Sequence, residues 1–176
     1  MRRRIMAFVL LLCLPSLSVC WAQTLGIGDT APVDLVRTWD IDVRPNGEGL
    51  PAGQGSVAQG RLVYERRCLA CHGTLGQGGP HDRLAGGMGS LSTASPIKTV
   101  GSFWPYATTL FDYIRRAMPF EAPQTLSGDE VYAVVAYVLH LNELLPPDAT
   151  LDARSLPAVR MPNREGFRSQ HSTVHE

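Results

Sequence analysis

The stretch Cys68-Leu69-Ala70-Cys71-His72 decides how the rest of this 176-residue chain is interpreted. It places two thiols with two residues between them and an imidazole directly after the second thiol. The C-x-x-C spacing occurs in thioredoxin-like dithiols and in halves of zinc sites, whereas the added histidine is typical of covalent haem attachment. The flanking sequence has to distinguish these three kinds of site.

The sequence on both sides of the motif favours haem. Apolar residues at roughly helical spacing, Val57, Leu62 and Val63, lead up to it and continue to Leu69 inside it, and glycine-rich sequence follows it. A thioredoxin-like dithiol would instead follow a strand, and a zinc site would need further cysteines. The other two cysteines, Cys13 and Cys20, lie in a leader that we expect to be removed. We therefore expect Cys68 and Cys71 to attach one haem c and His72 to bind its iron.

Residues 1–22 have the pattern of a secretory signal peptide. Three arginines at positions 2 to 4 precede an apolar run over residues 5–13, and small residues lead to a cleavage site after Ala22. Pro15 and two serines interrupt the apolar stretch, so export with cleavage is favoured over a membrane anchor. The sequence before Cys20 only distantly resembles a lipoprotein box, which leaves lipidation as the second possibility. We expect a periplasmic protein without a membrane span after cleavage.

The charge balance argues against a nucleic-acid partner. The chain has 16 basic and 16 acidic residues. Removing the leader removes three arginines and no acidic residue, which leaves 13 basic and 16 acidic side chains and a net charge of −3. A surface that binds nucleic acid needs an excess of basic residues.

The remaining chain divides into one domain and two arms. Residues 23–55 contain three prolines, several glycines and no sustained apolar period. Residues 146–176 begin with Pro146-Pro147 and also lack periodicity. We expect both segments to be extended arms that bury little of their own apolar surface, on either side of a domain at residues 56–145.

Three stretches of this domain have the period of a helix. The first runs from about residue 56 to the cysteine pair, the second over residues 106–117, and the third over residues 127–142 behind a Ser127–Glu130 capping box. The second places Leu110, Tyr113, Ile114 and Ala117 on one face. Gly60 and Tyr64 on the first helix and Tyr137 on the last suit a close helix crossing.

The segment between the first and second helices is a loop with eight glycines in residues 73–101. A loop this long needs something large to wrap. We expect the second ring nitrogen of His72 to donate to a backbone carbonyl in this loop, for which Pro80 is the candidate.

A sixth iron ligand is expected from a methionine, because a thioether stabilises ferrous haem and closes the iron to small molecules. Met88, Met118 and Met161 compete for this role. Met118 follows a helix and precedes Pro119, so a rigid turn can aim its sulfur toward the iron, and we select it. The alternatives are a plain core position for Met118 and a place at the haem edge for Met88.

The features of residues 56–145 together resemble the class I cytochrome c family: a first helix ending in C-x-x-C-H, a Met118-Pro119 turn, and a capped last helix beginning at Leu126-Ser127-Gly128-Asp129-Glu130. The resemblance implies an all-α fold of three to five helices around one covalent haem. It also implies that His72 and Met118 are the metal ligands.

A narrower resemblance extends into both arms. The stretches Trp39-Asp40-Ile41-Asp42-Val43-Arg44-Pro45, Val100-Gly101-Ser102-Phe103-Trp104-Pro105-Tyr106 and Met161-Pro162-Asn163-Arg164 are similar to the haem subunits of sulfite and sulfane dehydrogenases. That resemblance implies a heterodimer or larger complex with a molybdenum-cofactor subunit, which supplies single electrons, and a downstream cytochrome or oxidase that receives them. A single C-x-x-C-H motif matches the one-haem subunit of a sulfite dehydrogenase better than the two-haem subunit of the sulfane type.

Two other functions compete with this one. A free periplasmic cytochrome c could shuttle electrons without a fixed partner, and a haem enzyme or gas sensor would need an open sixth position on the iron. No residue is evidently placed for acid–base catalysis, so we expect chemistry at sulfur to belong to the partner and not to this chain. Arms that bind a partner would distinguish the subunit of a dehydrogenase complex from the free shuttle.

Overall fold

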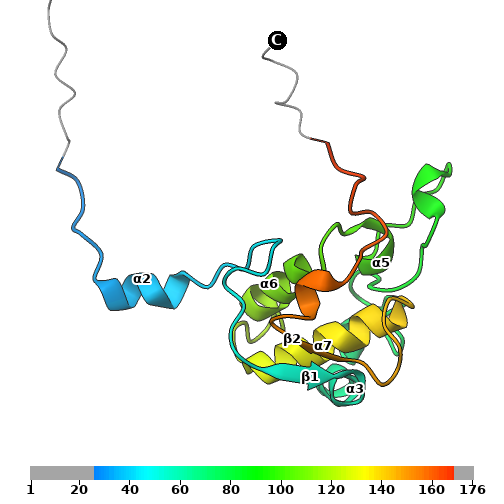
Figure 1. Ribbon diagram of the computed structural model, residues 1–176, viewed down its shortest axis with the longest axis horizontal. Coiled ribbons are helices and arrows are strands. Elements are labelled where there is room, and N and C mark those ends of the chain that lie inside the picture. The colour runs from blue at the N-terminus through cyan, green and yellow to red at the C-terminus, as the bar shows by residue number, and fades with distance from the viewer. Residues whose placement is uncertain (1–25, 169–176) are drawn as a thin grey trace, which may run out of the picture. The chain divides into compact units, whose positions relative to one another are not determined.

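The computed structural model describes residues 26–168, so the leader expected at residues 1–22 lies outside the described part. The fold is mostly helical, as predicted (Figure 1). The helices are α2 (Val33–Trp39), α3 (Val57–Arg67), α4 (Leu69–His72), α5 (Val100–Phe103), α6 (Ala107–Ala117) and α7 (Gly128–Leu141), with 3₁₀ turns η1 (Ser90–Ser92) and η2 (Leu156–Ala158) and strands β1 (Gln54–Ser56) and β2 (Thr150–Asp152). By its contacts the chain divides after Val33, and α3 to α7 belong to the main unit from Asp34 onward.

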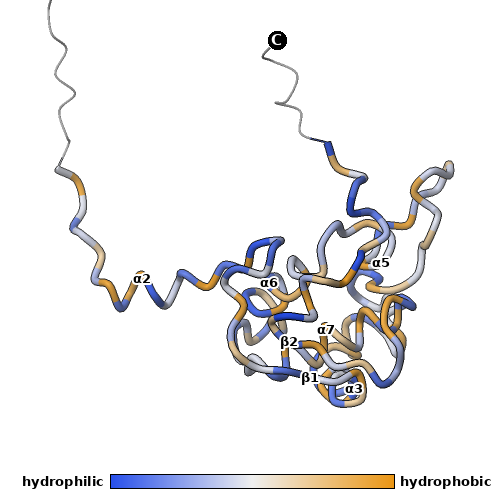
Figure 2. Tube along the Cα trace, viewed as in Figure 1, coloured by the Kyte–Doolittle hydropathy of each residue, from blue (hydrophilic) through white to orange (hydrophobic). Residues whose placement is uncertain are grey.

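Helix α7 forms the centre of the core, with α3 and α6 packed against it (Figure 1). Every side chain from Val131 to Leu139 is buried, and the tube in Figure 2 is hydrophobic along much of this helix. A helix that is apolar on all sides has to lie inside the fold. Its predicted capping box is present, because the Glu130 N–H donates to the Ser127 hydroxyl (3.3 Å) and the Ser127 N–H donates to the Glu130 carboxylate (3.0 Å).

The predicted close crossing of the first and last helices is confirmed. A Cβ atom on Gly60 would lie 1.8 Å from the carbonyl oxygen of Ala133, a distance that no side chain can occupy. The rings of Tyr64 and Tyr137 pack beside this contact, with centroids 5.3 Å apart and planes inclined by 58°. The glycine therefore sets how closely α3 approaches α7.

Helix α6 has the predicted amphipathic character, with one difference. Leu110 and Ile114 are buried with Phe111, but Tyr113, expected on the same face, is 47% exposed and meets the edge of Trp104 at a centroid distance of 5.8 Å. The helical period therefore predicted the helix correctly, but the buried face is narrower than predicted and does not include Tyr113.

The two arms are less separate from the domain than their composition suggested. Their backbone is largely irregular, but β1 and β2 pair antiparallel, with Gly55 opposite Leu151. Val43 of the first arm and Leu151, Leu156 and Met161 of the second are buried in the main core. The expectation that the arms bury little apolar surface was wrong for these parts, because scattered apolar residues can fill a core without any period of their own.

Candidate functional site

The C-x-x-C-H motif occupies one tight helical turn at the end of α3. The Cys68 N–H donates to the Tyr64 carbonyl at 2.9 Å and so ends α3, and the His72 N–H donates to the Cys68 carbonyl at 2.9 Å within α4. Cys68 and Cys71 are half-buried and do not form a disulfide. Both thiols and the imidazole therefore project from a single rigid turn.

The surroundings of Cys68 do not favour the dithiol alternative. Burial raises the pKa of its thiol to about 11, and Cys71 and the carboxylate of Glu121 act in the same direction. A redox-active dithiol needs the opposite, a lowered pKa that gives a thiolate at neutral pH. The influence of Glu121 also indicates that the turn after α6 lies within electrostatic reach of the motif.

The imidazole of His72 is held by the backbone of the following loop. Its Nδ1 lies 2.8 Å from the carbonyl oxygen of Asp82. Because a carbonyl can only accept, Nδ1 carries the proton and Nε2 is free to bind a metal. The specific expectation that Pro80 supplies the carbonyl was wrong. The His81 N–H instead donates to the Cys71 carbonyl at 3.1 Å, so the loop turns there, and the next carbonyl along it reaches the ring.

The glycines of this loop allow it to fold back onto the motif. Gly73 has a φ of +79°, and a Cβ atom there would lie 2.5 Å from the carbonyl oxygen of Gly78. A Cβ atom on Gly79 would lie 2.8 Å from the carbonyl oxygen of Cys71. Side chains at these positions would displace the loop that carries Asp82 to the imidazole.

The three candidate methionines lie in different environments. Met118 caps the end of α6, where its N–H donates to the Ile114 carbonyl at 3.1 Å, and its side chain is half-buried against the core. Met88 is 48% exposed in the glycine-rich loop. Met161 is 3% exposed and belongs to the hydrophobic core. Only Met118 combines a fixed backbone with a side chain that is neither enclosed nor fully in solvent.

The donors and their surroundings fit a haem. The motif supplies two unpaired thiols, and His72 presents Nε2 because Nδ1 is already bonded. Half-buried apolar side chains pack against the core from the motif, the loop and the segment before α6, namely Leu69, Leu84 and Trp104. Three further apolar side chains, Leu75, Ile97 and Phe120, are left exposed in the loop and after Met118. A flat apolar cofactor would find both its covalent anchors and apolar contacts in these segments.

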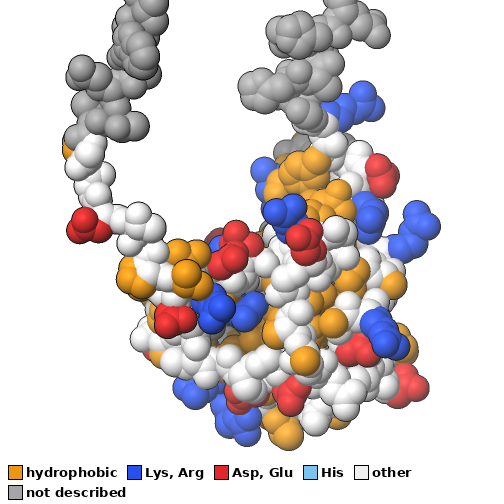
Figure 3. All heavy atoms as spheres, turned by 60° about the vertical axis from the view of Figure 1, so that its left-hand side comes forward, with side chains coloured by type: hydrophobic (Ala, Val, Ile, Leu, Met, Phe, Trp, Pro, Cys, Tyr) orange, Lys and Arg blue, Asp and Glu red, His pale blue; other side chains and the backbone are white. Residues whose placement is uncertain are grey.

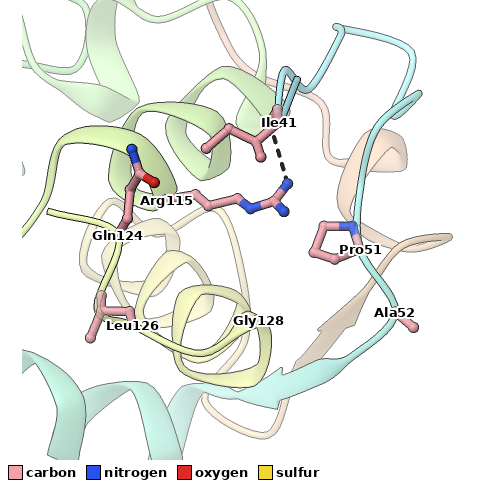
Figure 4. Close-up of a pocket in the computed structure, with 7 residues that line it drawn as sticks. All are labelled: Ile41, Pro51, Ala52, Arg115, Gln124, Leu126 and Gly128. Carbon is pink, nitrogen blue, oxygen red and sulfur yellow. Dashed lines mark hydrogen bonds between the residues drawn. The ribbon is translucent and has the colours of Figure 1, made fainter. Parts of the chain in front are cut away.

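A second feature, which the sequence did not indicate, is a shallow pocket of about 290 Å³ between the first arm and α6 (Figure 4). It is lined by Ile41, Pro51, Ala52, Arg115, Gln124, Leu126 and Gly128. The Arg115 guanidinium donates to the Ile41 carbonyl at 3.3 Å, and nearby the Val43 N–H donates to the Asp112 carboxylate at 2.8 Å. These contacts attach the first arm to α6, and none involves a predicted ligand.

Comparisons with known proteins identify the family of the domain that carries this site. The family model described as cytochrome c oxidase, cbb3-type, subunit III, matches residues 55–138. The sulfane dehydrogenase SoxCD from Paracoccus pantotrophus contains a chain 42% identical to this one, with a TM-score of 0.78 over 84% of this chain and 73% of that chain. The likeness therefore extends beyond residues 56–145 into the arms.

The helical fold and the C-x-x-C-H turn define a c-type cytochrome domain, whose cofactor is haem c. This chain belongs to the cytochrome c family and is similar to a chain of the sulfane dehydrogenase SoxCD.

Proposed function

We propose that this chain is the mono-haem electron-transfer subunit of a molybdenum-containing sulfite or sulfane-sulfur dehydrogenase. The observation that carries the proposal is the 42% identity to a chain of a sulfane dehydrogenase, over 84% of this chain, together with a motif turn that presents both thiols and a fixed imidazole. Because the chain has one C-x-x-C-H motif, the proposal includes one haem.

The proposed site consists of four residues. Cys68 and Cys71 would hold the haem through thioether bonds, and His72 and Met118 would bind its iron. When bound, haem c supplies a reversible one-electron couple between ferric and ferrous iron. The chain's own part is to hold the imidazole through Asp82 and to place the thioether of Met118 at the end of α6.

The proposed partner is a subunit that carries the molybdenum cofactor, in a heterodimer or larger complex. Oxidation of sulfite to sulfate releases two electrons, so one haem has to accept and pass on an electron twice in each turnover. Helix α2 supports a partner, because none of its residues is buried and Leu35, Val36 and Trp39 are 51%, 48% and 70% exposed. A respiratory cytochrome or oxidase would receive the electrons.

The proposed location is the periplasm, reached through the signal peptide of residues 1–22. Haem c is attached outside the cytoplasm, and the thiols of Cys68 and Cys71 are compatible with an oxidising compartment once they are bonded to haem. Between residues 26 and 168, no helix is long and apolar enough to cross a membrane. On the face shown in Figure 3, basic and acidic side chains are interspersed, and the proposal includes no nucleic-acid partner.

The test is to isolate the protein gently from its periplasm and to identify what co-purifies. A complex that contains molybdenum and one haem per copy of this chain, and whose haem is reduced rapidly by sulfite, would support the proposal. A partner that responds only to a sulfane-sulfur donor would fix the substrate. A lone cytochrome that no sulfur compound reduces would favour the free shuttle, and sulfite oxidation by this chain alone would contradict its assignment as a relay.

A further inference from the structure

Asn142, the residue that ends α7, has a side chain only 2% exposed and bonds a loop distant in sequence. Its Nδ2 donates to the carbonyls of Val138 at 2.9 Å and Leu84 at 3.1 Å. Its Oδ1 accepts from the Gly86 N–H at 3.2 Å. Two of the three hydrogen bonds therefore go to a short segment of the glycine-rich loop and not to α7 itself.

The same loop segment is also held by the start of α5. The hydroxyl of Thr99 donates to the Gly86 carbonyl at 2.7 Å, and the Val100 N–H donates to the Leu84 carbonyl at 3.2 Å. Thr99 is 2% exposed, so this contact is also shielded from water. Leu84 and Gly86 are thus bonded to the start of α5 and, through the buried amide of Asn142, to the end of α7.

The loop segment held in this way begins two residues after the carbonyl that binds the imidazole. Asp82 accepts from Nδ1 of His72 at 2.8 Å, and the Leu84 N–H donates to the Gly76 carbonyl at 2.8 Å. Two residues of backbone leave little freedom between a fixed Leu84 and the Asp82 carbonyl. Asn142 is therefore one of the groups that fix the position of that carbonyl relative to the imidazole, together with Gly76 and Val100.

We propose that Asn142 is a positioning residue for the axial imidazole. By fixing the backbone at Leu84 and Gly86, it keeps the Asp82 carbonyl in place to accept from Nδ1 of His72. A strong hydrogen bond at Nδ1 makes the imidazole more basic, which stabilises ferric over ferrous iron and keeps the reduction potential low. This inference rests on the proposed role of His72 as an iron ligand.

The test compares Asn142→Leu with the wild-type holoprotein. Leucine has nearly the same shape but makes none of the three hydrogen bonds, so the loop is released without a large cavity. Two quantities are measured: the midpoint potential, by redox titration, and the exchange with water of the Nδ1 proton of His72, by NMR on protein labelled with ¹⁵N-histidine. We expect a more positive potential and exchange about fivefold faster, since a lost hydrogen bond is equivalent to about 1 kcal/mol.

Gly101→Ala tests the same contact without removing the amide. A Cβ atom at this position would lie 2.4 Å from Oδ1 of Asn142, so the methyl group displaces the side chain from its bonds. We expect the same directions of change as for Asn142→Leu. Because the two substitutions lie at different helices, the same change in both variants would be attributable to the contact of Asn142 that they share.

A matched control separates positioning from general destabilisation. Leu151 is a buried residue of β2, with 2% exposure. Strand β2 pairs with β1, which leads into the start of α3, whereas Cys68 follows the other end of that helix. Leu151→Ala should lower the melting temperature at least as much as Asn142→Leu and leave the potential and the Nδ1 exchange unchanged.

Equal potentials and exchange rates in the wild type and Asn142→Leu would overturn the inference, as would shifts of the same size in Leu151→Ala. Failure of the proposed function would look different. In that case the wild-type chain itself would show no covalent haem in a pyridine haemochrome assay and no haem-shifted Nδ1 resonance for His72.

Discussion

The phenolic oxygen of Tyr64 lies 2.8 Å from the carbonyl oxygen of Gly73, to which its hydroxyl donates a hydrogen bond. Tyr64 is fully buried in α3, and Gly73 is the first residue after the C-x-x-C-H turn. Burial raises the pKa of the Tyr64 phenol to about 12, so it remains a donor throughout the pH range in which the protein is studied. The bond ties the start of the loop to the helix that precedes the motif.

Tyr64→Phe should therefore lower the free energy of unfolding of the holoprotein by about 1 kcal/mol, because the Gly73 carbonyl loses its partner. Urea denaturation followed by circular dichroism measures this change. Tyr137→Phe is the matched control, because Tyr137 packs against the same ring and its hydroxyl forms no hydrogen bond to residues 26–168. An equal loss in both variants would show that the hydroxyl of Tyr64 contributes nothing specific.

Gly60→Ala should destabilise the fold by roughly 3 kcal/mol or more, because the new methyl group would lie 1.8 Å from the Ala133 carbonyl and force α3 away from α7. Thermal unfolding measures the effect. Arg66→Ala, at an exposed position of the same helix, is the control and should change the stability by less than about 0.5 kcal/mol. A stable Gly60→Ala variant would mean that the two helices can separate at little cost.

Met118→Ala should remove the sixth iron ligand. The ferric protein is then expected to lose the absorption band that arises from sulfur-to-iron charge transfer and to bind small ligands such as carbon monoxide in the ferrous state. Met88→Ala and Met161→Ala are the controls and should leave the spectrum unchanged. A Met118→Ala variant that keeps its six-coordinate spectrum would transfer the assignment to another residue.

Asp152 should make the stability of the protein depend on pH. Hydrogen bonds from the Ser155 and Arg154 N–H groups, at 2.8 Å and 2.9 Å, lower the pKa of its carboxyl group. Because the pKa is lower in the folded state, the carboxylate stabilises the protein at pH values above its unfolded pKa, and this contribution is lost as the pH falls through the folded pKa. Asp152→Ala should therefore be less stable than wild type at pH 7, with a smaller difference near pH 3.

Urea unfolding at both pH values checks this expectation. Asp148→Ala, at an exposed position before β2, serves as the control at pH 7. A difference between the wild type and Asp152→Ala that stays constant from pH 7 to pH 3 would show that the carboxylate charge makes no contribution.

Local patterns were sufficient to predict α3, α6, α7 and the motif, whereas α2, in a segment expected to be an extended arm, and the short α5 were missed. The capping box and the apolar run behind Ser127 predicted α7, and the spacing of Cys68, Cys71 and His72 predicted a turn that presents all three side chains. Such features depend on residues a few positions apart. The roles of the four site residues stay predictions until a haem-loaded protein is studied.

Features that depend on distant segments were not predictable in this way. The carbonyl that meets His72 belongs to Asp82 and not to Pro80, because the path of the loop depends on where its glycines allow it to fold back. The pairing of β1 with β2 and the burial of Leu151 join residues almost a hundred positions apart. Asn142 gave no signal in the sequence, since its hydrogen bonds are made with Leu84 and Gly86, which are distant in the chain.

The pairing of β1 with β2 also has a consequence for synthesis. Because a chain is made from its N-terminus, residues 68–72 are complete well before Thr150–Asp152, the strand that pairs with Gln54–Ser56. Under the proposed function, in which haem is attached outside the cytoplasm, Cys68 and Cys71 would be accessible to the cofactor before the second arm adds its strand to the fold.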